Sequence, residues 1–229
     1  MSVKTIGVLG GLGPAASCYF YSLLTALCPA ARDQGHPDIL LYSKASVPDR
    51  SAFLLGEGPS PLPALEEGIR LLTAAGAQAL ALPCATAHHF YAQLQAAAGG
   101  VPVLNMLALT AQALAGRGVA RAALLATAGT YRSGAFCAAL EREGVAPLLP
   151  GPEGQAALTA LIYSIKAGRQ PGAEQLEAVA APLLERGAQR VILGCTELSL
   201  LRGLDAVYID PMRLLAERLI GWACGGEAL

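Results

Sequence analysis

The chain has 229 residues and a formal net charge of −1; 54% of its residues are hydrophobic and 14% are charged. Ordinary domains carry about 25% charged residues, so this composition predicts an extensive core. The balanced charge, without a basic block, excludes a surface built for nucleic acid or anionic membranes. Because no apolar run of about 18 residues and no signal peptide is readable, we expect a cytoplasmic protein with a small-molecule site.

Short apolar runs alternate with helix-length segments in the first half of the chain. The predicted strands are Val3–Leu9, Ile39–Ser43, Ala79–Leu82 and Val101–Leu104. The predicted helices are Ala15–Leu27, Pro61–Ala75, Ala87–Ala98 and Met106–Leu114. Strands that alternate with helices of this length indicate a parallel sheet with helices on both faces.

The second half repeats this order. A strand at Arg121–Ala126 leads through a turn into a helix from about Tyr131 to Glu143, and a strand at Val191–Leu193 leads into Cys195 as Ala79–Leu82 leads into Cys84. A divergent duplication accounts for this similarity. We therefore predict an α/β fold of two pseudo-symmetric Rossmann-like lobes, each a central parallel sheet flanked by helices, with the ligand cleft between them. The predicted first lobe spans residues 1–104 and is completed by a C-terminal helix at 210–229; the second spans 105–209.

Two of the six cysteines stand at equivalent strand ends. In open α/β sheets ligands bind beyond the carboxyl ends of the strands, so we expect Cys84 and Cys195 to approach one ligand from opposite sides. Each also precedes a predicted helix, whose first amide groups favour a thiolate. The alternative for a single cysteine is a small buried core residue, and this is our interpretation of the remaining four, which we assign to helices as free thiols. They are Cys18, Cys28, Cys137 and Cys224.

A metal site is not expected. Cys84, His88 and His89 are close in sequence, but zinc needs about four ligands and no second cluster completes the set.

Six motifs in order along the chain resemble the aspartate/glutamate racemase family, whose members use two cysteines and no pyridoxal phosphate. The motifs are Ile6–Pro14, Val47–Arg50, Pro83–His88, Leu124–Thr130, Ile162–Gly168 and Gly194–Leu198. The resemblance implies a cofactor-independent amino-acid racemase, an isomerase acting on aspartate, glutamate or a related acidic amino acid. It implies 1,1-proton transfer between Cys84 and Cys195, and a homodimer.

The resemblance and the predicted loop positions also indicate which residues bind an amino acid or dicarboxylate. They are Gly11, Leu12, Lys44, Arg50, Ala85, Thr86, Thr127, Lys166, Thr196 and Glu197. Arg50 suits a carboxylate because its guanidinium is planar and always charged. For Lys44, Arg50 and Lys166 the alternative is a solvated surface side chain.

Two positions depart from the family pattern. The family usually has Asn directly after the first cysteine, where this chain has Ala85, and often has Asn where Lys44 stands. Losing one hydrogen bond to a charged group weakens binding by roughly 10- to 150-fold unless another group, such as Lys44, replaces it.

Other functions therefore stay open. The same fold could serve an isomerase, a decarboxylase or a hydantoin racemase acting on another carboxylate, or a catalytically silent protein that binds dicarboxylates. The turn at Gly11–Ala16 also fits a loose dinucleotide-binding pattern. That pattern needs an acidic residue after the second strand, where Ser43 and Lys44 stand, so we expect no nicotinamide cofactor.

Overall fold

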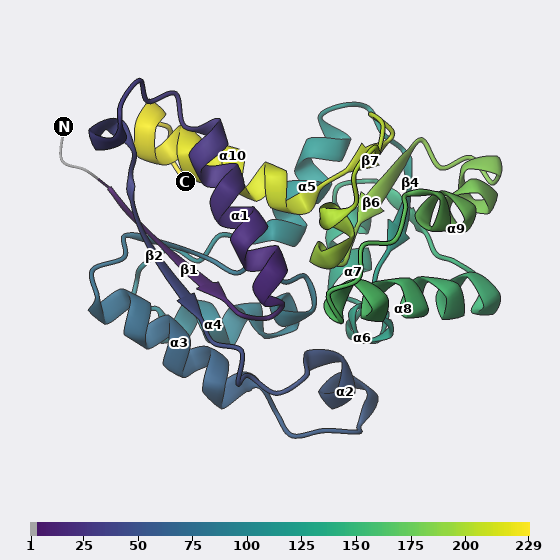
Figure 1. Ribbon diagram of the computed structural model, residues 1–229, viewed down its shortest axis with the longest axis horizontal. Coiled ribbons are helices and arrows are strands. Elements are labelled where there is room, and N and C mark those ends of the chain that lie inside the picture. The colour runs from purple at the N-terminus through teal and green to yellow at the C-terminus, as the bar shows by residue number, and fades with distance from the viewer. Residues whose placement is uncertain (1–3) are drawn as a thin grey trace.

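The computed structural model describes residues 4–229 and contains two parallel sheets (Figure 1). In the first sheet, β1 (Thr5–Gly10) lies between β2 (Asp38–Ser43) and β3 (Ala79–Ala81). A parallel bridge between Leu80 and Val103 marks a fourth, very short strand position next to β3. Of the predicted strand Val3–Leu9, Val3 lies outside the described residues.

The second sheet has the order β5-β4-β6-β7, with all neighbours parallel. Its strands are β5 (Ala146–Leu148), β4 (Arg121–Leu125), β6 (Arg190–Leu193) and β7 (Tyr208–Ile209). In both sheets the first strand along the chain lies between the second and the third, and the fourth position follows the third. The predicted α/β fold with two similar lobes is confirmed.

Helices cover both sheets and enclose three apolar cores. The α-helices are α1 (Pro14–Leu27), α2 (Arg50–Leu55), α3 (Leu62–Ala74), α4 (Tyr91–Ala97), α5 (Met106–Ala115), α6 (Ala128–Ser133), α7 (Ala135–Arg142), α8 (Pro152–Lys166), α9 (Glu174–Glu185) and α10 (Pro211–Gly225). The 3-10 helices are η1 (Asp33–Gly35), η2 (Thr86–Phe90) and η3 (Thr196–Leu200). None of the helices within residues 4–229 combines the length and the hydropathy that a membrane crossing needs.

Two helices connect the lobes. Asn105 caps α5 by accepting hydrogen bonds from the N–H groups of Leu107 and Ala108, and Asp210 caps α10 in the same way through Met212. From these equivalent starts, α5 packs against α7 of the second half, whereas α10 packs back against α1 of the first (Figure 1). The two helices also pack against each other, so one core continues from lobe to lobe and holds both sheets in a fixed orientation.

Two predicted helices are each divided. The segment Ala87–Ala98 is not one α-helix: it consists of the end of η2 followed by α4, because the N–H of His88 bonds to the carbonyl of Ala85 three residues back. The predicted helix near Tyr131–Glu143 is α6 and α7, separated by Gly134 with a left-handed φ of 67°.

The expectation of buried cysteines is only partly correct. Cys84 and Cys195 are buried, but Cys18 is exposed, and Cys28, Cys137 and Cys224 are half-buried. A helix in contact with the core on one side leaves its other side to solvent, which is where Cys18 of α1 lies.

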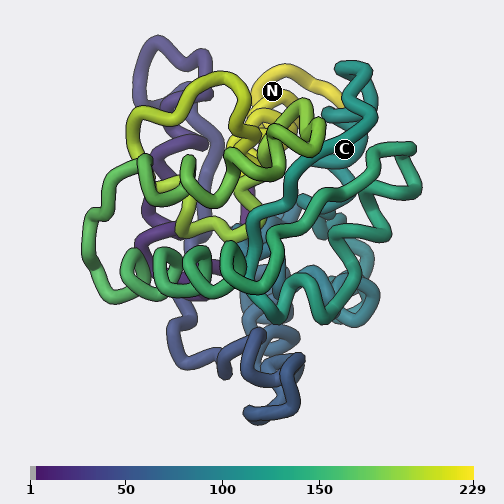
Figure 2. The backbone as a smooth tube through the Cα atoms, turned by 90° about the vertical axis from the view of Figure 1, so that its right-hand side faces the viewer, coloured from purple at the N-terminus to yellow at the C-terminus, as the bar shows by residue number. Residues whose placement is uncertain are grey.

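Helix α2 stands apart from both sheets. It forms the lowest part of the molecule in Figures 1 and 2 and was not predicted from sequence. Asp49 caps it by accepting from the N–H of Ala52. Helix α2 contacts α6 and η2, so it reaches across to the second lobe and closes the edge of the cleft.

Candidate active site

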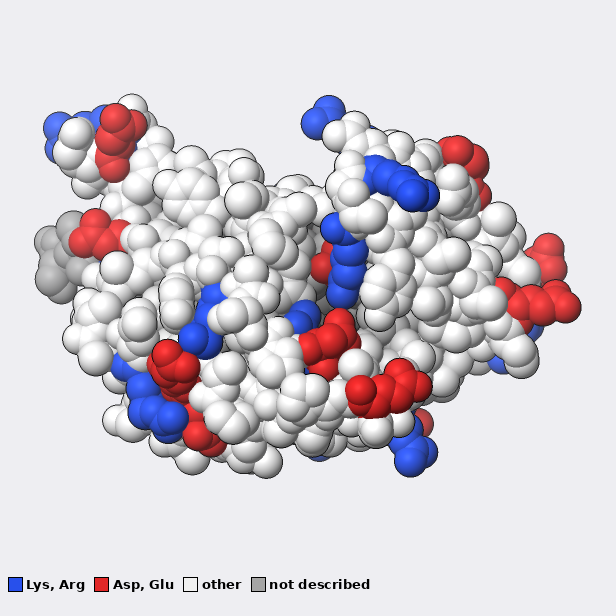
Figure 3. Space-filling view, turned by 60° about the horizontal axis from the view of Figure 1, so that its bottom comes forward, with Lys and Arg blue, Asp and Glu red and all other residues white. Residues whose placement is uncertain are grey.

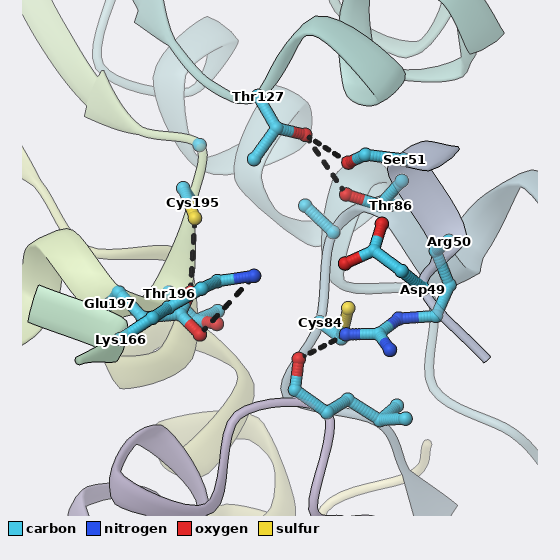
Figure 4. A pocket seen from close by; sticks show the side chains of 13 residues that line it. Asp49, Arg50, Ser51, Cys84, Thr86, Thr127, Lys166, Cys195, Thr196 and Glu197 are labelled. Atoms are coloured by element: carbon cyan, nitrogen blue, oxygen red, sulfur yellow. Dashed lines mark hydrogen bonds and ion pairs between the residues drawn. The ribbon is translucent and has the colours of Figure 1, made fainter. Parts of the chain in front are cut away.

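One pocket between the lobes contains both cysteines that follow strands. Cys84 comes after β3 and Cys195 after β6, each is 6% exposed, and their sulfur atoms face the same space from opposite sides (Figure 4). A helix follows each cysteine, as predicted, but both are short 3-10 helices: η2 begins two residues after Cys84, and Cys195 is the N-cap of η3. The N–H of Glu197, in the first turn of η3, lowers the pKa of Cys195, but burial and neighbouring side chains have the larger effect on it.

Cys195 is bound to a carboxylate of its own lobe. Its Sγ donates a hydrogen bond to Oε2 of Glu197 at 3.0 Å, and Nζ of Lys166 lies 3.9 Å from Oε1 of the same carboxylate (Figure 4). Burial and then the Glu197 charge raise the pKa of Cys195 well above its ordinary value, although Lys166 opposes this. The structure thus holds Cys195 as a protonated thiol.

Cys84 instead lies beside a cation, the guanidinium of Arg50 (Figure 4). Burial lowers the pKa of Arg50, but the neighbouring Cys84, Asp49 and Glu197 side chains raise it and the net shift is upward. The terminal nitrogens of Arg50 donate to the backbone carbonyls of Leu12, Val47 and Pro48. These bonds hold the guanidinium in place next to the Cys84 sulfur.

A cluster of hydroxyl groups joins α2 to both lobes. Oγ1 of Thr127 lies 3.1 Å from Oγ of Ser51 and 3.3 Å from Oγ1 of Thr86 (Figure 4). Thr130 adds contacts of 2.8 Å to Thr86 and 3.1 Å to Thr127. Gly129 makes this close approach possible, because a Cβ there would lie 2.5 Å from Cα of Ser51.

Residues 9–219 match the profile of the family described as Asp/Glu/Hydantoin racemase. The chain belongs to this family. It is therefore an enzyme of a racemase family, that is, an isomerase, as the sequence predicts.

Curated and solved relatives agree with this assignment. The chain is 28% identical to the broad specificity amino-acid racemase RacX of Bacillus subtilis over 85% of this chain and 86% of RacX. It is 26% identical to the aspartate racemase of Picrophilus torridus, with a TM-score of 0.82 over 97% and 94% of the two chains. The glutamate racemase of Francisella tularensis, solved with D-glutamate, shares the fold, with a TM-score of 0.69 at 17% identity over 97% of this chain and 81% of that one.

Most of the predicted site residues of this racemase-family enzyme line the pocket. The predicted residues found there are Leu12, Arg50, Cys84, Ala85, Thr86, Thr127, Lys166, Cys195, Thr196 and Glu197. Gly11 and Lys44 do not line it. The ammonium group of Lys44 lies 3.1 Å from Glu67 and 3.4 Å from the Tyr42 hydroxyl, so it does not stand in for the missing asparagine at position 85.

The glycine turn after β1, Gly11–Gly13, packs against a carboxylate of the protein itself, that of Glu197. A Cβ on Gly13 would overlap Oε1 of Glu197, and one on Gly11, whose φ is 83°, would meet the backbone of Lys44 at 2.5 Å. Sequence reasoning assigned this turn to a substrate carboxylate. In the structure the absence of a Cβ at Gly13 lets the first lobe pack closely against Glu197 of the second.

Four residues that line or support the pocket were not predicted from the sequence. Three of them, Asp49, Ser51 and Gly194, line the pocket. Asp49 and Ser51 are the chain neighbours of Arg50, so the motif that contains Arg50 could have indicated them. The fourth, His88, supports the backbone of Cys84. Its Nε2 accepts a hydrogen bond from the N–H of Met106 at 3.1 Å. Its Nδ1 therefore carries the proton and donates to the carbonyl of Cys84 at 2.9 Å, which fixes the backbone of that cysteine.

The pocket is closed in this conformation. Its volume is about 10 Å³, close to the space of one water molecule, and an amino acid is several times larger. A molecule of that size fits the pocket only if side chains or α2 move. Figure 3 shows basic and acidic side chains gathered in the hollow between the two halves, on a surface otherwise poor in charge. Within residues 4–229, no three His, Cys, Asp or Glu side chains are grouped as metal ligands.

Proposed function

We propose that this protein is a cofactor-independent amino-acid racemase in which Cys84 and Cys195 exchange a proton with the α-carbon from opposite faces. The observation that carries the proposal is the unequal pair of sulfur atoms in one pocket. One lies beside the guanidinium of Arg50, and the other donates a hydrogen bond to Glu197. A two-base mechanism needs such a pair, because one sulfur must begin as a base while the other still holds a proton.

In one direction Cys84, with the guanidinium of Arg50 beside it, acts as the base and removes the α-proton. The electron pair of the broken C–H bond passes into the adjacent carboxylate, and the positive charges around that group stabilise it. Cys195 then gives its proton to the opposite face of the carbon, and the configuration is inverted. In the reverse direction Cys195 is the base and Glu197, its hydrogen-bond partner, is placed to receive its proton.

The charges of the pocket support an acidic amino acid, such as aspartate or glutamate, as substrate. Arg50 and Lys166 come from opposite lobes and provide two cations for two carboxylates, while Glu197 provides an anion for the substrate ammonium group. Within the described residues, the buried Nε of Arg50 and Oε1 of Glu197 have no hydrogen-bond partner. Buried polar atoms of this kind are costly unless a ligand satisfies them.

The direct test is exchange of the α-proton in D₂O. The protein is incubated with each enantiomer of aspartate and glutamate, and with alanine as a neutral comparison, and deuterium at the α-carbon is followed by NMR together with optical rotation. We expect deuterium in the inverted product of an acidic amino acid. If neither exchange nor inversion occurs with any of the three, the racemase proposal fails, and binding of dicarboxylates without turnover would then identify a silent homologue.

The homodimer and the cytoplasmic location stay predictions. The first can be checked by sedimentation, in which a monomer mass would contradict it.

A further inference from the structure

Two cysteines far from the pocket lie in contact with each other. The Sγ atoms of Cys28 and Cys224 are 3.5 Å apart, although the residues are 196 positions apart in sequence. Cys28 caps the C-terminal end of α1 and Cys224 lies in the last turn of α10, and these two helices pack together (Figure 1). Both thiols are free and half-buried.

The thiols are reachable from solvent. A surface cavity of about 330 Å³ is lined by both cysteines together with Lys4, Gly35 and His36. A volume of this size admits a small molecule. Lys4, whose ammonium group lies 4.5 Å from the centre of the Trp222 ring, places a positive charge at this end of α10. A thiolate or an anionic thiol reagent is attracted to such a site.

We propose that Cys28 and Cys224 form a reversible disulfide that joins the ends of α1 and α10, with a low-molecular-weight disulfide such as oxidised glutathione as the oxidant. Bond formation brings the sulfur atoms from 3.5 Å to about 2.05 Å, a decrease of about 1.5 Å. The proposal is independent of the racemase activity, because neither cysteine lines the pocket between the lobes.

The two sulfur atoms have different roles in the exchange. Burial, then the hydrogen bond to Cys28 and its charge, raise the pKa of Cys224 to about 11, so Cys224 remains a thiol at neutral pH. Cys28, as the thiolate, attacks one sulfur of the oxidant and releases one small thiol. Cys224 then loses its proton, attacks the Cys28 sulfur of the mixed disulfide and releases the second small thiol. Two protein thiols are thereby oxidised and one small disulfide is reduced to two thiols.

The bond would act on stability rather than on the pocket. Helix α1 has 14 residues, so its two ends are about 20 Å apart. Cys28 lies at its C-terminal end, whereas its N-terminal end follows Gly13, which packs against Glu197. At the start of α10, its N-cap Asp210 accepts hydrogen bonds from the hydroxyl groups of Ser199 in η3 and Tyr19 in α1. A covalent link between the opposite ends of these helices closes a loop of nearly the whole chain and restricts the unfolded state.

The experiment uses the full chain treated with oxidised glutathione near pH 8, with dithiothreitol treatment as the reduced reference. Thiols are then blocked with N-ethylmaleimide, and intact mass and peptide mapping locate the products. We expect the loss of two hydrogens, a linked Cys28–Cys224 peptide, and a melting temperature higher by about 5–15 °C that returns to its starting value on reduction. Cys18→Ser and Cys137→Ser are matched controls that keep all three results, whereas Cys28→Ser and Cys224→Ser each abolish them.

Three results would overturn the proposal. They are an unchanged number of free thiols after oxidation, a stable glutathione adduct on Cys28 or Cys224 without a linked peptide, and a disulfide that uses a different cysteine. The mapping is done on the unsubstituted protein, so it decides the question even if a serine variant does not fold.

Discussion

The thiol of Cys195 donates its hydrogen bond to the Glu197 carboxylate at 3.0 Å, and the same carboxylate lies 3.9 Å from the ammonium group of Lys166. The proton of Cys195 is thus held between a sulfur and an anion that is itself balanced by a cation. Cys84 lies beside Arg50 instead, and no carboxylate within residues 4–229 is hydrogen-bonded to its sulfur. This difference between the two sulfur atoms leads to the first two predictions.

Replacing either sulfur should stop racemisation while leaving part of the proton exchange. We expect Cys84→Ser and Cys195→Ser each to lower kcat by about 10²- to 10⁴-fold, because serine is a far weaker acid and base at neutral pH. Each variant should also wash deuterium into only one enantiomer, the one whose α-proton faces the remaining cysteine. Cys137→Ser is the control. Equal residual exchange into both enantiomers would contradict the assignment of one cysteine to each face.

Glu197→Gln should shift the pH dependence of the reaction to lower pH. The carboxylate raises the pKa of Cys195, after burial, so removing its charge lowers that pKa. In the direction where Cys195 is the base, activity then rises at a lower pH; in the direction where it is the acid, activity is lost at a lower pH. The measurement is kcat/KM against pH for each enantiomer. Glu67→Gln, outside the pocket, is the control, and a profile unchanged by Glu197→Gln would refute the coupling.

Gly13→Ala should damage the site without touching either cysteine. The new methyl group would overlap Oε1 of Glu197 and displace the carboxylate that holds the Cys195 proton. Because a shift of about 1 Å in a catalytic group costs roughly 10²-fold, we expect a loss of that order in kcat. The matched change Gly225→Ala meets no atom within 4 Å and should retain full activity. Activity in Gly13→Ala equal to that of the control would show that the close packing is unimportant.

Gly129→Ala should weaken closure of the site by α2. Its Cβ would lie 2.5 Å from Cα of Ser51, so α2 must move away from α6. Overpacking of this kind costs about 1–3 kcal/mol, which corresponds to a roughly 5- to 150-fold loss in kcat/KM if turnover requires the closed form. Steady-state kinetics compared with Gly225→Ala measure the effect. A stable variant with normal kinetics would mean that α2 need not approach α6 for catalysis.

His88 should make the folded state sensitive to acid. Burial lowers its pKa, so below about pH 6.5 the unfolded chain binds a proton that the folded protein does not, and stability falls with decreasing pH by at most about 1.4 kcal/mol per pH unit. His88→Gln should remove the contribution of His88 to this slope. It should also lower the free energy of unfolding at neutral pH by about 1–3 kcal/mol, if the Cys84 carbonyl or the Met106 N–H is left without a hydrogen bond. Urea unfolding at several pH values measures both effects. The exposed His89 is the control position, and an equal slope in His88→Gln would argue against this role.

Local sequence was sufficient to predict the alternation of strands and helices and the equivalence of the two halves. Those features depend on apolar periodicity and on turn residues, which act over a few neighbours. The positions of Cys84 and Cys195 at strand ends, and their presence in one pocket, followed from the general geometry of parallel sheets. The helices expected after these cysteines are present as the short 3-10 helices η2 and η3.

Contacts between distant segments determine the surroundings of each sulfur. The sequence offered Arg50, Lys166 and, as a replacement for the family's asparagine, Lys44 as candidate cations for the site. Folding places Lys44 against Glu67 outside the pocket, Arg50 beside Cys84, and Lys166 near the carboxylate that binds Cys195. The contact of Cys28 with Cys224 has the same origin, since 196 residues separate them in the chain. Which side chains are buried and which charges are paired depends on the segments that pack together, and a local sequence pattern contains no information about those long-range contacts.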